Sequence, residues 1–96
     1  LLIGIECFEG TDELIKRCDN YKKSGDKKIL IKLSKYKQHS ILDVPTIGIQ
    51  TLKNLKKYNY EGLFIEKNNC IILEKDKSIN FCNENNLFLS TTNKID

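Results

Sequence analysis

The chain has 96 residues, of which 40% are hydrophobic and 30% are charged, with five glycines and one proline. This composition excludes collagen-like, low-complexity and disordered proteins, and the length suits one domain with a single modest core. No apolar run approaches the roughly 20 residues of a membrane span, and no signal peptide is predicted. Because methionine is absent, we expect the chain to be a fragment of a longer protein.

The net charge of +3 is unevenly distributed along the chain. Basic residues crowd between Lys16 and Lys37, where Asp19 and Asp26 are the only acids. Such a segment attracts phosphates, nucleic acid or an anionic membrane surface, although solvated surface lysines explain most of it equally well. Arg17 is the only arginine and the aromatic residues show no stacking motif, which argues against a nucleic-acid partner.

The number and spacing of the cysteines argue against a zinc site and against a disulfide framework. A zinc site is not expected, because no two cysteines form a C-x-x-C pair and only one histidine occurs. A disulfide framework needs a secretory context, for which the sequence gives no sign, so the prediction is four small buried thiols in a reducing cytosol. They are Cys7, Cys18, Cys70 and Cys82.

The first elements are a strand and a helix. Residues 1–8 are apolar and predict a buried strand. Thr11 is a candidate cap for the helix that follows, and the acids after it favour the positive end of a helix. Residues 24–26 end this helix. Its apolar positions share one face: Leu14, Ile15, Cys18 and Tyr21.

The next elements are a strand over residues 28–34 and a loop over residues 35–43. Pro45 suits the approach to a second helix, with Thr46 as its candidate cap. This helix ends within residues 59–62. Its apolar stripe has a spacing of three: Ile49, Leu52, Leu55 and Tyr58.

The last third of the chain predicts short strands around a helix. Two strands, residues 63–65 and 70–73, are joined by a tight turn at 67–69. A short helix follows over residues 75–86, and residues 87–89 form the closing strand.

The resulting order, β-α-β-α-β-β-α-β, predicts an α/β fold with a mostly parallel sheet. We expect one domain over residues 1–90, followed by a tail at 91–96. In open α/β sheets ligands bind beyond the carboxyl ends of the strands, so we searched those ends for chemistry.

One candidate corner runs from the first strand into the first helix. Gly10 lets backbone approach a ligand closely, and the N–H groups after Thr11 favour an anion. Glu9 and Asp12 add carboxylates, which fit beside an anion only if a divalent cation or a proton intervenes. An ordinary capped helix explains the same residues.

The second candidate corner follows the second strand. Lys32 stands within an apolar strand, where a phosphate partner or simple exposure at an edge strand explains its charge. Asp43 stands before the second helix, where it holds Mg²⁺, orients a water or merely begins a turn. His39 is expected to be exposed. Neither common nucleotide-binding glycine motif occurs, so the residues alone indicate a phosphate-handling domain whose two corners converge.

These corners contain a series of residues in a characteristic order: E-G-T-D at 9–12, Lys32, Gln38 and D-V-P-T-I-G at 43–48. The series, extended by residues 61–66 and 86–89, resembles the C-terminal domain of the LpxI-type UDP-2,3-diacylglucosamine pyrophosphatases. The resemblance covers nearly the whole chain. E-G-T-D alone is a weak motif, but the ordered series is fairly specific.

The resemblance implies Mg²⁺-dependent hydrolysis of UDP-2,3-diacylglucosamine to lipid X and UMP, a step of lipid A synthesis in Gram-negative bacteria. It implies an N-terminal domain in the same polypeptide, with substrate between the two domains, and a cytoplasmic protein in peripheral contact with the inner membrane. It assigns catalysis and metal binding to Asp43. Substrate binding falls on Glu9, Gly10, Thr11, Asp12, Lys32, Gln38 and Thr46.

One stretch departs from the family pattern, since His39 and Ile41 stand where the family usually has Asp and Arg. If that arginine holds a phosphate, its loss removes a contact worth roughly 1.5–3 kcal/mol, unless Lys35 or Lys37 replaces it. The alternative function is a nucleotide- or sugar-phosphate-binding module without catalysis. An RNA-binding domain is a third option, which a steep salt dependence of binding would reveal.

Overall fold

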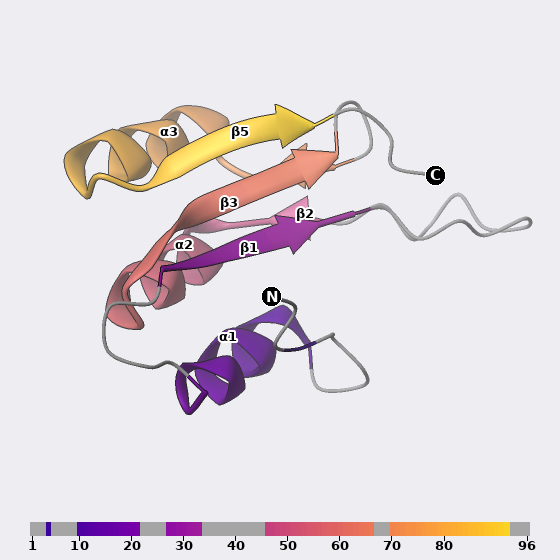
Figure 1. Ribbon diagram of the computed structural model, residues 1–96. Coiled ribbons are helices and arrows are strands. Elements are labelled where there is room, and N and C mark those ends of the chain that lie inside the picture. The colour runs from indigo at the N-terminus through magenta and orange to yellow at the C-terminus, as the bar shows by residue number, and fades with distance from the viewer. Residues whose placement is uncertain (1–3, 5–9, 22–26, 34–45, 67–69, 93–96) are drawn as a thin grey trace, which may run out of the picture.

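The computed structural model describes Gly4 and residues 10–21, 27–33, 46–66 and 70–92 (Figure 1). The predicted α/β fold with parallel sheets is confirmed, whereas the predicted first strand and the turn at 67–69 lie outside the described residues. The elements are, in chain order, α1 (Thr11–Asp19), β1 (Lys28–Lys32), β2 (Thr46–Ile47), α2 (Ile49–Lys57), β3 (Tyr60–Glu66), β4 (Ile71–Ile72), α3 (Lys75–Glu84) and β5 (Phe88–Thr92).

The described strands form two parallel sheets. The larger has the order β1-β3-β5, and the smaller pairs β2 with β4. Since all pairs are parallel, the carboxyl ends of β1, β3 and β5 lie at one edge of the larger sheet, with Lys32 paired to Ile65 and Glu66 paired to Thr92. Strand β4 lies within the strand predicted at 70–73, but β2 and its pairing with β4 were not predicted, because β2 has only two residues.

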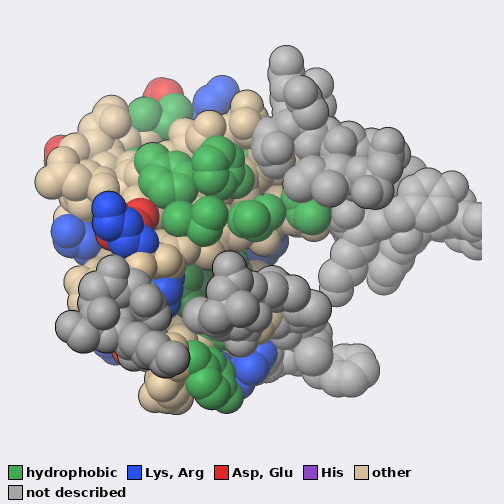
Figure 2. All heavy atoms as spheres, viewed as in Figure 1, with side chains coloured by type: hydrophobic (Ala, Val, Ile, Leu, Met, Phe, Trp, Pro, Cys, Tyr) green, Lys and Arg blue, Asp and Glu red, His purple; other side chains and the backbone are tan. Residues whose placement is uncertain are grey.

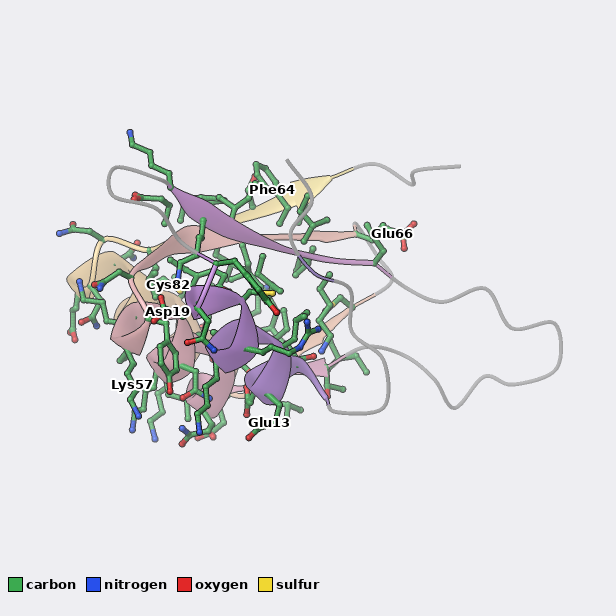
Figure 3. All side chains as sticks on the ribbon, turned by 60° about the horizontal axis from the view of Figure 1, so that its bottom comes forward. Glu13, Asp19, Lys57, Phe64, Glu66 and Cys82 are labelled. Carbon is green, nitrogen blue, oxygen red and sulfur yellow. The ribbon has the colours of Figure 1, made fainter. Side chains whose placement is uncertain are left out.

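The core lies between the larger sheet and the helices, which pack on one of its faces (Figures 1 and 3). Ile15 of α1, Leu52 and Leu55 of α2 and Leu63 of β3 are completely buried. Each such side chain contributes about 1.5–3 kcal/mol relative to an exposed one. The stripes predicted for α1 and α2 therefore face the core, except that Tyr21 is 57% exposed because α1 ends at Asp19.

Gly62 shows why the third strand is longer than predicted. We expected this glycine to end the preceding helix, but it lies buried inside β3, opposite Phe88 of β5. A Cβ atom at this position would stand 2.2 Å from the Phe88 carbonyl oxygen. Only glycine therefore permits this strand pairing. At the other end of the chain, β5 continues through Thr92 and includes the first two residues of the predicted tail.

The cysteines of the described residues are free thiols. Cys18 and Cys82 are buried, as predicted, and burial raises the pKa of the Cys82 thiol. Cys70 is only half-buried. Cys7 lies outside the described residues.

A buried ion pair closes the amino-terminal end of β1. Lys28 is only 5% exposed; its ammonium donates to the Asp19 carboxylate at the end of α1 and lies 4.4 Å from the centre of the Tyr60 ring. The Tyr60 hydroxyl donates to the Ile15 carbonyl oxygen at 3.0 Å. Solvation of the basic segment, expected from the sequence, is thus wrong for Lys28, because the charge has its partners inside the fold.

None of the helices among the described residues is long and apolar enough to cross a membrane.

Candidate functional site

Gly10 begins helix α1 and occupies the cap position. Its φ of 88° lies in a region that side chains disfavour, which explains a glycine there, and its carbonyl oxygen accepts the first helical hydrogen bond from Leu14 at 3.1 Å. The predicted cap, Thr11, is instead the first residue of the helix, and no side-chain hydrogen bond caps α1. The prediction was wrong because the chain bends one residue earlier. The Thr11 hydroxyl therefore serves another partner.

That partner is Lys32, the last residue of β1. Its ammonium donates to Thr11 Oγ1 at 2.8 Å, and both residues are half-buried. Strand β1 and helix α1 run antiparallel, since Thr11 meets the end of the strand and Asp19 meets its start. The contact explains why a lysine ends an apolar strand: it points toward the helix start and not simply into water.

The electrostatics of this contact are unusual. The first turn of a helix carries a partial positive charge, so a cation beside it is unfavourable unless an anion intervenes. Among the described residues, no carboxylate forms an ion pair with Lys32. The described part of this corner thus presents an ammonium and helical N–H groups, which bind phosphate oxygens, together with the acids Asp12 and Glu13 in the first turn of α1.

The start of α2 meets the start of α1. The Thr51 hydroxyl donates to the Asp12 carboxylate at 3.0 Å, joining residues 39 positions apart, and both side chains are half-buried. The first turns of α1 and α2 therefore lie against each other, whereas Asp43 of the second predicted corner lies outside the described residues. Sequence analysis missed Thr51, because a threonine in the first turn of an amphipathic helix carries no signal until its partner is known.

Thr46 does not cap α2. It is an exposed residue of β2, and the cap position is held by Gly48 in an extended conformation. The prediction was wrong because pairing with β4 draws the residues after Pro45 into a short strand before the helix begins. Thr46 stands three residues before the start of α2.

Three predicted site residues, Glu9, Gln38 and Asp43, lie outside the described residues. The same is true of His39 and Ile41, whose departure from the family pattern is described above.

Two further residues near the same edge were not predicted. Glu66 ends β3, one residue beyond the partner of Lys32, and is only 3% exposed; Figure 3 places it at the opposite end of the fold from Asp19 and Cys82. Burial raises the pKa of the Cys70 thiol, and the Lys32 ammonium acts on it in the opposite direction. An acid that closes an apolar strand was the signal that could have found Glu66.

The described residues contain no group of three or more His, Cys, Asp or Glu side chains that could hold a metal ion. The carboxylates that they bring near the Lys32 corner include Asp12, which accepts a hydrogen bond from Thr51. Mg²⁺ is usually held by one or two carboxylates together with substrate phosphates and water, so a carboxylate at this corner suits an ion that binds with its substrate.

Comparison with known proteins identifies the family of the chain. A family model described as the LpxI C-terminal domain matches residues 1–90 of the 96. No curated protein matches the chain.

Proposed function

Since the chain belongs to the LpxI C-terminal domain family, a family of UDP-2,3-diacylglucosamine hydrolases, we propose that it forms the diphosphate-binding half of such an enzyme. The reaction is the hydrolysis of UDP-2,3-diacylglucosamine to lipid X and UMP. The observation that carries the proposal is the Lys32 ammonium, which donates to Thr11 Oγ1 beside the start of α1 and forms no ion pair with a carboxylate of the described residues. A diphosphate supplies the anion that this pair of positive groups needs.

In the proposed complex, Lys32 and the first N–H groups of α1 bind oxygens of the diphosphate. Thr11 holds the Lys32 ammonium in place, and Thr51 holds the Asp12 carboxylate, so that two helices and one strand fix the position of the charged groups. Groups fixed in advance stabilise the charge that develops on the phosphoryl oxygens without reorganising. Thr46, which stands in β2 just before the Gly48 cap of α2, is proposed to contact the substrate from the second corner.

We further propose Mg²⁺ as the cofactor, which Asp43 would hold. Bound there, it neutralises phosphate charge and lowers the pKa of a coordinated water. Asp43 orients the water that attacks the phosphorus nearest the sugar, and UMP leaves. Glu9 and Gln38 bind the substrate.

The substrate's acyl chains come from a membrane, so we place the protein in the cytoplasm with a peripheral contact at the inner membrane. The exposed lysines of α2, Lys53, Lys56 and Lys57, suit an anionic leaflet, where each near-surface lysine contributes about 1 kcal/mol.

The test is UMP release from UDP-2,3-diacylglucosamine by the full-length protein. We expect release that stops on addition of EDTA and returns with excess Mg²⁺. Asp43→Asn abolishes it, whereas Asp76→Asn, which changes an exposed acid of α3, leaves it unchanged. Binding of the substrate without UMP release would identify a binding module, and full activity in EDTA or in Asp43→Asn would contradict the proposal.

A further inference from the structure

We draw no further inference here: the strongest candidate, the exposed apolar face of the β1-β3-β5 sheet that points away from the helices and carries Ile29, Ile31 and Leu33 (Figure 2), supports none, because nothing in the described part of the structure shows what covers it.

Discussion

Two lysines of strand β1, four residues apart, face the same helix in opposite situations. Lys28 at the start of the strand is buried, paired with Asp19 and stacked against the Tyr60 ring. Lys32 at the end is half-buried and donates to the neutral Thr11 hydroxyl. The difference lies in the helix ends. Asp19 and the negative end of α1 satisfy Lys28, whereas Lys32 meets the positive end of the same helix.

The comparison separates a lysine with a structural role from one to which we assign the binding of a ligand under the proposed function. A buried cation with its own carboxylate is structural, because removing either partner leaves an uncompensated charge. A cation held beside a helix N-terminus without a carboxylate has unused capacity for an anion. The two ends of β1 therefore predict different consequences for substitution, with the largest effects at the closed end.

Removing the ion pair between Lys28 and Asp19, at the amino-terminal end of β1, is expected to cause the largest loss of stability. Asp19→Ala leaves the Lys28 ammonium buried without its carboxylate; since the Asp19 side chain is 39% exposed, we expect a loss of about 2–3 kcal/mol in the free energy of unfolding. Urea denaturation of the full-length protein measures it. Glu84→Ala, an exposed acid at the end of α3, serves as the control and should change stability little. If both variants change the free energy of unfolding equally, the ion pair between Lys28 and Asp19 does not stabilise the fold.

The closed end also predicts a pH dependence at high pH. Burial, and next the neighbouring Cys18 and Asp19 groups, raise the pKa of Tyr60 from 10 to about 12. Between pH 10 and pH 12 the unfolded chain therefore loses a proton that the folded chain retains, so stability falls as pH rises through this window, on the order of 2 kcal/mol. Denaturation at pH 9 and pH 11 should show a smaller fall for Tyr60→Phe. An equal fall in both proteins would exclude Tyr60 as its source.

A smaller effect is expected where the two corners meet. Thr51→Val removes the hydrogen bond to the Asp12 carboxylate. It should raise the activation free energy by about 1 kcal/mol, which lowers kcat/KM roughly fivefold. Thr51→Ser keeps the hydroxyl and is expected to keep most of the activity. If the serine variant is as slow as the valine variant, the methyl group and not the hydrogen bond is what matters there.

The sequence predicted the parts of the fold that depend on local pattern. Helix α2 was predicted because apolar residues recur at every third position of its sequence. Two of them, Leu52 and Leu55, are completely buried. Strand β2 could not be predicted, since its two residues form a strand only by pairing with β4, whose Ile71 partners Thr46. Because of the same pairing, the cap position of α2 is Gly48 and not the predicted Thr46.

The elements that carry the described candidate residues were predictable from the sequence, but the contacts of these residues were not. Lys32 and Gly10 to Asp12 were found from a strand end and a helix start. Their partners come from tertiary packing: Thr51 is 39 residues from Asp12, and Thr11 is 21 residues from Lys32. The burial of Lys28 was missed for the same reason, because a lysine at a strand start resembles a surface lysine until Asp19 and Tyr60 surround it.

The most direct test measures stability and catalysis together for Lys28→Met and Lys32→Met in the full-length protein. Lys32→Met should lower kcat/KM for UMP release by about 10- to 100-fold, as loss of a charged hydrogen bond predicts, while the free energy of unfolding changes little. Lys28→Met should lower the free energy of unfolding and leave kcat/KM of the folded enzyme nearly unchanged. Full activity in Lys32→Met, or a loss of activity in Lys28→Met as large as that in Lys32→Met, would contradict the division of roles between the two ends of β1.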